Sequence, residues 1–86
     1  MAGTDKRRGT TPRQEEFGAR LRDRREKLGY SQEALALRAN VNRTYIASLE
    51  SGHRNPSLDT MARLAKALEM DLGKLVRGLE QIRGHR

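Results

Sequence analysis

The stretch from Gln32 to Glu50 constrains the fold of this chain most, because it has the pattern of two short helices joined by a tight turn. Ser31 and Asn42 precede the two helices, and the side-chain oxygen of each can accept hydrogen bonds from unpaired backbone N–H groups. Apolar and small residues give each helix one apolar face: Leu35, Ala36, Ala39, Val41, Ile46 and Leu49. The turn, residues 40–42, is too short for long antiparallel arms. We therefore expect steeply crossing helices with the small Ala36 at their contact.

One further helix is predicted before this stretch. Thr11 and Gln14 can form a capping box around Pro12, so the helix is expected from Pro12 to Leu28, and Gly29 can end it in the left-handed conformation. Its inner face is formed by apolar residues at helical spacing: Phe17, Leu21 and Leu28. The charged residues are expected on a solvated outer face with local ion pairs: Arg20, Arg22, Asp23, Arg24, Arg25, Glu26 and Lys27.

Two more helices are predicted after the stretch, with Ser57 and Asp71 as their N-caps. The first repeats apolar residues at helical spacing: Leu58, Met61, Leu64, Ala65 and Leu68. The second does the same with Leu72, Leu75, Val76 and Leu79, although Gly73 and Gly78 make a regular helix there less favourable. No segment has the pattern of a β-strand. The sequence therefore predicts an all-α bundle of five short helices.

The stretch also resembles the helix-turn-helix of the lambda-repressor and Cro type, as found in Xre-like regulators. The matching residues in the motif are Gln32, Ala36, Val41, Ile46, Leu49 and Glu50-Ser51-Gly52, and the match extends from Phe17-Gly18 through Arg54-Asn55-Pro56-Ser57 to Leu75-Val76. Asn40 is a departure, because the family most often has Gly at this left-handed position, where Asn is the best tolerated substitute. The resemblance implies a five-helix lambda-repressor-like DNA-binding domain with the helix-turn-helix at helices 2 and 3.

This resemblance also suggests how the chain is divided. We place the helix-turn-helix domain at residues 11–79, after a disordered basic arm at residues 1–10. Residues 80–86 form a C-terminal tail or the end of the fifth helix. Basic residues of the arm, Lys6, Arg7 and Arg8, can follow the DNA backbone or enter a minor groove, and the alternative is a solvated tail without a partner.

The second helix of the motif is expected to read base edges in the major groove of double-stranded DNA. Ile46 and Leu49 fix its inner face, which leaves four residues pointing outward as base-contacting candidates: Arg43, Thr44, Ala47 and Ser48. Arg43 is the strongest candidate, because its planar guanidinium can donate two hydrogen bonds to guanine. The hydroxyls of Thr44 and Ser48 can also form hydrogen bonds to a base or a phosphate. The small side chain of Ala47 allows the helix to approach the DNA closely.

Contacts to the DNA backbone are expected from polar residues around the motif: Gln32, Asn42, Tyr45, His53, Arg54 and Asn55. The family commonly has a phosphate-binding Gln at the position of Gln32, where the helix N-terminus faces the same anion. Asn42 has the simpler role of a cap, and Tyr45 can either reach a phosphate or pack over the edge of the core. His53 has no second ligand nearby for a metal ion.

Composition narrows the function classes. The net charge of +7 suits a polyanionic partner, although Lys6, Arg7, Arg8 and Arg13 against Asp5 supply +3 of it within residues 1–14. The chain has no cysteine, and it has no apolar run long enough for a membrane span. No catalytic or phosphate-cradling motif is present. We therefore predict a cytoplasmic protein that is not an enzyme and has neither cofactor nor metal, with no membrane partner.

The predicted function is sequence-specific transcriptional regulation by a homodimer bound to a double-stranded DNA operator. Repression is favoured over activation, since a small domain can cover a promoter but the sequence shows no sensor or activation module. Two narrower versions stay open: an antitoxin with a toxin partner, and a restriction–modification controller protein, suggested by Arg43-Thr44-Tyr45-Ile46 with Arg54-Asn55. A different alternative is a protein-interaction module that contacts RNA polymerase or another part of the transcription machinery.

The candidate dimer interface is the end of the apolar stripe on the last helix. Leu79 and Ile82 continue this stripe beyond what a five-helix bundle of this size is expected to cover. The alternative is that Leu79 folds back onto the core.

Overall fold

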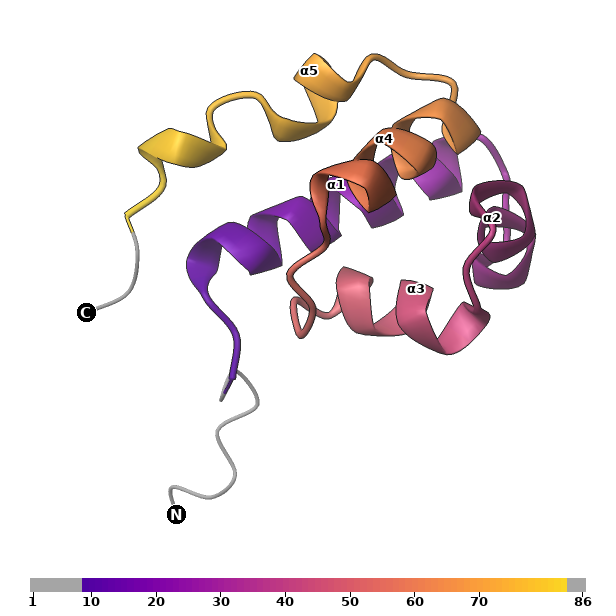
Figure 1. The fold of residues 1–86 in the computed structure, drawn as a ribbon, viewed down its shortest axis with the longest axis horizontal. Helices are drawn as coiled ribbons and strands as arrows, with labels where there is room; N and C mark the ends of the chain where they lie inside the picture. Colours follow the sequence, from indigo (N-terminus) through magenta and orange to yellow (C-terminus); the bar gives the residue numbers. More distant parts are fainter. Residues whose placement is uncertain (1–8, 84–86) are drawn as a thin grey trace.

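Five α-helices and one short 3₁₀ segment form the described part of the chain, residues 9–83 of the computed structural model (Figure 1). The elements are α1 (Pro12–Lys27), α2 (Gln32–Ala39), α3 (Arg43–Glu50), α4 (Leu58–Ala67), α5 (Leu72–Val76) and η2 (Leu79–Gln81). Residues 9–83 contain no β-strand. The predicted all-α fold of five helices is therefore confirmed.

Local capping signals determine where most helices begin. The hydroxyl of Thr11 accepts a hydrogen bond from the Gln14 amide, and the Gln14 side chain accepts one from the Thr11 amide, which completes the capping box. Ser31, Asn42 and Ser57 cap α2, α3 and α4 in the same way, as predicted. Asp71 precedes α5 but makes no side-chain cap hydrogen bond.

The turn of the helix-turn-helix has the expected backbone geometry. Asn40 lies in the left-handed region, with φ 59° and ψ 49°. Arg63 of α4 donates hydrogen bonds of 3.1 Å to the carbonyls of both Ala39 and Asn40. Arg63, which is remote in sequence, therefore holds the turn in place, in addition to the tolerance of Asn40 for the left-handed conformation.

The core lies where the five helices meet. Its fully buried side chains come from every helix: Leu21, Leu35, Ile46, Leu49, Leu64, Leu68 and Leu75. α3 packs against α1 and α2, α2 packs against α4, and α5 packs against α1 and α4. Gly18 lies at the contact between α1 and α3, where an added Cβ atom would meet the backbone oxygens of Leu49 and Glu50. The small residue thus allows α3 to lie directly against α1.

The C-terminal part differs from the predicted helix through Leu79. α5 ends at Val76, Gly78 adopts a φ of +74°, and the chain continues as η2. Arg20 of α1 donates hydrogen bonds to the carbonyls of Leu75 and Arg77, which are left without helical partners where α5 stops. The break between α5 and η2 is thus stabilised by Arg20 of α1 as well as by Gly78.

The expected solvated face of α1 is also only partly correct. Arg25 is buried instead of solvated. The side chain of Arg13 donates hydrogen bonds to the carbonyls of Leu79 and Ile82. The side chain of Arg24 donates hydrogen bonds to the carbonyls of Leu68 and Glu69. Together with Arg20, these arginines fasten the chain after α4 onto α1.

Leu58 is a further correction to the predicted apolar faces. It was expected on the inner face of its helix, but its side chain is 69% exposed. Leu58 is the first residue of α4, and no other helix covers that end.

Candidate nucleic-acid interface

α3 has one face in the core and one face outside it. Ile46 and Leu49 are buried against α1 and α2, as predicted. Of the four predicted base-contacting residues, Arg43 and Thr44 are exposed, and Ala47 and Ser48 are half-buried. The structure therefore places all four outside the buried core, as contact with DNA bases would require. Their contacts with bases stay a prediction.

The predicted backbone-contacting residues at the helix starts are already engaged within the protein. Asn42 accepts a hydrogen bond of 2.7 Å from the Tyr45 amide, which is its capping role. Gln32 begins α2, and its side-chain N–H donates a 3.0 Å hydrogen bond to Glu50 Oε1. The carboxamide of Gln32 is thus fixed at the N-terminus of α2, beside α3.

Glu50 belongs to a buried ion pair that the sequence interpretation did not include. Arg25 Nε lies 2.6 Å from Glu50 Oε2, and Arg25 Nη2 lies 3.0 Å from Glu50 Oε1. The two side chains are only 11% and 5% exposed. The hydrogen bond to Glu50 raises the pKa of Arg25 above its already high value, although burial opposes the shift. The pair joins the end of α3 to α1 while satisfying both buried charges.

A signal for this pair is present in the sequence. Arg25 follows Phe17 and Leu21 at intervals of four residues, so it lies on the same inner face of α1. A charged residue on an apolar face indicates a buried partner, and Glu50 closes the helix that packs against α1.

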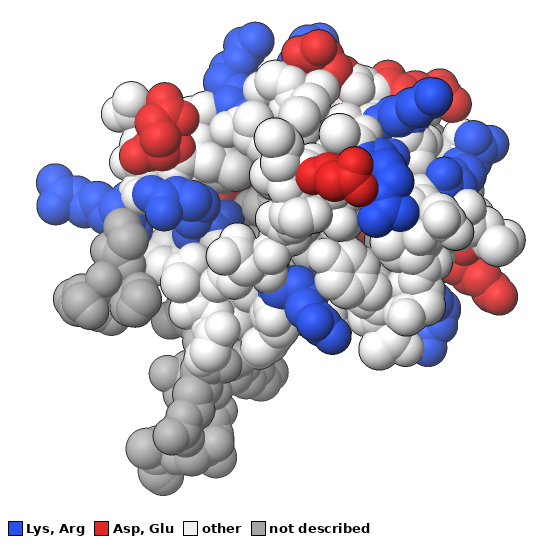
Figure 2. Space-filling view, viewed as in Figure 1, with Lys and Arg blue, Asp and Glu red and all other residues white. Residues whose placement is uncertain are grey.

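The exposed surface around α3 is positive. Residues 34–58 contain a single carboxylate, Glu50, whose charge is buried and paired with Arg25, whereas Arg38, Arg43 and Arg54 are exposed. Figure 2 shows Asp and Glu side chains along the upper edge of this face, and also at its centre and at its right-hand side. Two exposed carboxylates lie just outside residues 34–58, Glu33 at the start of α2 and Asp59 at the start of α4, but the arginines outnumber them. Such a surface suits a polyanion.

A polar hollow of about 460 Å³ lies beside the start of α3. It brings together four predicted contact residues, Asn42, Thr44, Tyr45 and Arg54, with Thr60 and Arg63 of α4. The guanidinium of Arg54 stands 5.3 Å from the centre of the Tyr45 ring, which is a cation–π contact. Arg54 is therefore held next to α3, although it comes from the following loop. The sequence interpretation did not include Arg63, which contacts the turn from 23 and 24 residues away.

The remaining predicted site residues are less closely grouped. His53 is exposed and its Nδ1 lies 3.0 Å from the Ser51 hydroxyl. Asn55 lines a different, apolar groove, so the loop places Arg54 and Asn55 at separate hollows. Lys6, Arg7 and Arg8 lie outside the described residues. Leu79 and Ile82 are half-buried, and Leu79 packs against the core. Their role in a dimer interface stays a prediction.

Residues 9–83 contain neither a cluster of metal-ligating side chains nor a helix that could span a membrane. Between residues 9 and 83, no group of three or more His, Asp or Glu side chains is arranged to hold a metal ion. None of the described helices combines the length and apolar character that crossing a membrane requires.

Comparisons with known proteins agree with this geometry. A sequence model of the helix-turn-helix family matches residues 21–75. Control protein C.MunI from Mycoplasma sp is 36% identical over 66 residues, which cover 76% of this chain and 89% of that protein. Control protein C.BamHI from Bacillus amyloliquefaciens is 45% identical over 53 residues, which cover 60% of this chain and 65% of that protein.

Solved structures show the same fold. The restriction-modification controller protein C.AhdI from Aeromonas hydrophila superposes with a TM-score of 0.71 and 40% identity, covering 72% of this chain and 94% of that one. The P22 c2 repressor, solved in complex with a synthetic operator, gives a TM-score of 0.67 and 32% identity, with coverages of 72% and 94%. The matched region contains the capped α2–turn–α3 unit described above. The chain therefore belongs to the lambda-repressor-like helix-turn-helix family of DNA-binding transcription regulators, which is not an enzyme family.

Proposed function

We propose that this protein binds a specific operator as a homodimer, with α3 of each copy in the major groove, and represses transcription from the promoter it covers. The main support is the exposed face of α3, where Arg43 and Thr44 are accessible and the only carboxylate of the helix itself, Glu50, is buried. Arg43 supplies base recognition, and Gln32 and Arg54 hold the flanking phosphates. The described part of the chain measures up to 38 Å along its longest axis. Two copies in contact can therefore place their α3 helices about 34 Å apart, one turn of the duplex.

The controller version of this function has specific support. Two control proteins and C.AhdI, a restriction-modification controller, share 36–45% identity with the chain over the aligned residues. We therefore propose that the operator regulates a restriction–modification system in the cytoplasm. The antitoxin and the polymerase-binding module have less support, because the relatives named above are control proteins, a controller protein and a repressor.

Replacing Arg43 by alanine tests base recognition. If Arg43 donates two hydrogen bonds to guanine, the variant should lose about 1–3 kcal/mol of specific binding and its preference at one base pair per half-site. Binding to random DNA should change less. Titrations of operator and random duplexes at one salt concentration measure both effects. Equal weakening on the two duplexes would instead assign Arg43 to a phosphate.

Arg54→Ala is the contrasting variant. Because Arg54 is held beside α3 by the Tyr45 ring and is expected to contact a phosphate, its loss should weaken operator and random duplexes alike. The slope of log affinity against log salt should become shallower by roughly one unit. A selective loss of operator binding would show that Arg54 reads a base.

Deletion of residues 1–10 tests the proposed basic arm. Gly9 and Thr10, the described residues of this segment, do not belong to the hydrophobic core, so helix content and unfolding should change little. If Lys6, Arg7 and Arg8 follow the DNA, binding should become weaker and less dependent on salt. The full chain at the same salt concentrations is the control, and an identical salt slope would mean that the arm does not touch DNA.

A further inference from the structure

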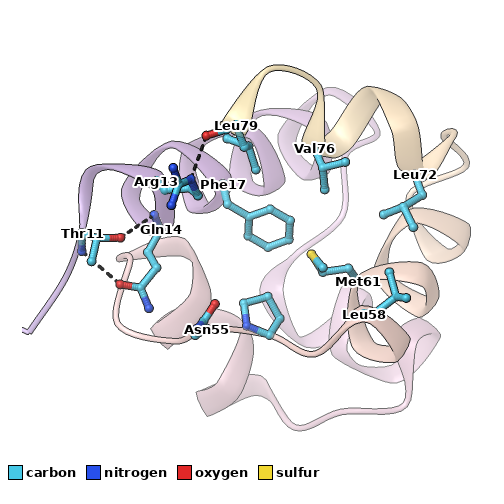
Figure 3. Close-up of a pocket in the computed structure, with 11 residues that line it drawn as sticks. Thr11, Arg13, Gln14, Phe17, Asn55, Leu58, Met61, Leu72, Val76 and Leu79 are labelled. Atoms are coloured by element: carbon cyan, nitrogen blue, oxygen red, sulfur yellow. Dashed lines mark hydrogen bonds between the residues drawn. The ribbon is translucent and has the colours of Figure 1, made fainter. Parts of the chain in front are cut away.

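The two ends of α3 are held by different parts of the molecule. At the C-terminal end, Glu50 is paired with Arg25 of α1. The loop beyond that end places Asn55 in the lining of an apolar groove beside α1 (Figure 3). The N-terminal end, where Arg43 begins the helix, is instead joined to α2 by the turn of residues 40–42. The position of Arg43 therefore depends on how this turn is held.

Arg63 of α4 supplies the contact that holds the turn. Its Nη1 lies 3.1 Å from the carbonyl oxygens of both Ala39 and Asn40. These carbonyls lie at the C-terminal end of α2, where a helix leaves its last carbonyls without helical partners. Within residues 9–83, no backbone amide is paired with either carbonyl. The positive guanidinium also suits the negative end of the α2 dipole. Arg63 therefore caps α2 from another helix, at the point where the chain turns toward α3.

The orientation of the guanidinium is set by the turn and not by the nearest carboxylate. Asp59 Oδ2 lies 3.3 Å from Arg63 Nε, but this nitrogen is buried and makes no hydrogen bond. The Asp59 side chain is 83% exposed, and an exposed pair of this kind holds a side chain weakly. Nη2 reaches only the Thr60 hydroxyl, at the long distance of 3.5 Å. The two well-formed hydrogen bonds of Arg63 thus both go to the turn.

Arg63 also fills the space on both sides of the turn. It lines the polar hollow beside the start of α3, together with Asn42 and Thr44. It lines a second hollow of about 460 Å³ as well, which is formed by α4 and the end of α2. Removing the guanidinium would therefore open the space beside the turn and leave the two carbonyls without their donor.

A small shift of the turn matters because base reading demands close geometry. Two hydrogen bonds from Arg43 to guanine require the guanidinium to be placed within about 0.5 Å and 10–20° of the productive position. Arg43 follows Asn40 by only three positions, so a change of the backbone at Asn40 moves the start of α3 relative to α2. Attraction to phosphates tolerates such a shift better, since it depends mainly on charge. Loosening the turn should therefore reduce discrimination between sequences more than overall affinity for DNA.

We propose that Arg63 is a positioning residue, which sets the start of α3 for base reading without touching DNA itself. The proposal rests on the proposed function, in which Arg43 reads a base, and it adds a residue of α4 that determines how sharply the base is read. α4 thereby supports the helix-turn-helix through one side chain that reaches back 23 and 24 residues along the chain.

Arg63→Met tests the proposal, and Lys66→Met is its matched control. Both changes remove one positive charge from α4 and keep a long apolar side chain, but in the described structure only Arg63 bonds the turn. The ratio of operator affinity to random-duplex affinity should fall about tenfold in Arg63→Met and stay at the wild-type value in Lys66→Met. The slope of log affinity against log salt should be equal in the two variants. A slope shallower by about one unit in Arg63→Met would make Arg63 a phosphate contact and overturn the proposal.

Hydrogen exchange without DNA separates positioning from a general loss of stability. The Val41 amide bonds the Ala36 carbonyl at 2.9 Å across the turn, so its exchange rate reports whether the turn stays closed. In Arg63→Met this amide should exchange about tenfold faster, as the loss of a hydrogen bond to a charged group implies, while the amides of α1 keep their wild-type rates. Equal acceleration throughout the chain would show only lower stability and would contradict a positioning role.

The two measurements together separate this proposal from the proposed function. If the wild type preferred no sequence, the operator function would fail, and the exchange rate at Val41 would still decide whether Arg63 positions the turn. If the wild type read an operator and Arg63→Met kept the full affinity ratio, the operator function would stand and the positioning role would be rejected.

Discussion

Replacing Gly18 by alanine is expected to lower the free energy of unfolding, although the same change stabilises an open helical position by about 1 kcal/mol. The added Cβ would lie 2.2 Å from the Leu49 carbonyl oxygen and 2.8 Å from that of Glu50. Both are backbone atoms of α3, so they cannot move aside as a side chain can. α1 and α3 would have to separate, and we expect a loss of about 3 kcal/mol, at the upper end of usual overpacking costs.

Gly73→Ala is the control for this change. It also places alanine in a helix, but the nearest atom to the added Cβ belongs to the exposed side chain of Asp71, which can rotate away. Urea unfolding followed by circular dichroism should therefore show Gly73→Ala at or above wild-type stability and Gly18→Ala well below it. If Gly18→Ala were as stable as the wild type, the close approach of α3 to α1 would be refuted.

Removal of Arg25 is the second change with a large expected effect. Arg25→Met leaves the carboxylate of Glu50, which is 5% exposed, without its charged partner. Breaking one side of a buried ion pair typically costs about 3–5 kcal/mol, because an uncompensated charge stays in the interior. The Arg25→Met, Glu50→Leu double variant should recover part of this loss, since it removes both charges together.

The surface pair of Arg22 with Glu26 on the same helix is the matched control. These side chains are 63% and 55% exposed, and Arg22 Nε lies 3.1 Å from Glu26 Oε2. Arg22→Met should therefore cost less than about 1 kcal/mol, since solvent screens exposed pairs. The variants would be compared by the midpoints and slopes of their urea unfolding curves. Equal losses of unfolding free energy for Arg22→Met and Arg25→Met would mean that burial does not increase the cost of breaking the pair between Arg25 and Glu50.

Local signals account for the parts of the fold that the sequence predicted correctly. The helix starts at Pro12, Gln32, Arg43 and Leu58 follow their capping residues directly, because the hydrogen bonds of a cap span only a few residues. The left-handed conformation of Asn40 was expected from the resemblance, because the family most often has Gly at this position. The lambda-repressor-like fold and its family followed from the resemblance and were confirmed by comparison.

The errors concern contacts between residues that are distant in the sequence. The bonds from Arg13, Arg20 and Arg24 to carbonyls after α4 connect positions 44–69 residues apart. On a sequence these arginines look like an ordinary charged helix face. Whether an apolar residue is covered also depends on distant elements, so helical spacing placed Leu58 in the core although nothing covers it within the described chain.

The candidate site was predictable to the extent that it depends on one helix. Once Ile46 and Leu49 are assigned to the core, the outward position of Arg43 and Thr44 follows from helical geometry. The hollow beside α3 did not follow, because Thr60 and Arg63 reach it from α4. Neither the buried state of Glu50 nor its pairing with Arg25 was foreseen.

Selection of binding sites from random duplexes with the full chain tests whether α3 reads a DNA sequence. We expect enrichment of one sequence with two inverted half-sites about 10 base pairs apart from centre to centre. Each half-site should contain a guanine whose preference disappears in a parallel selection with Arg43→Ala. Failure to enrich any sequence, or an enriched site that Arg43→Ala selects unchanged, would contradict sequence reading by α3 and favour a protein-interaction module.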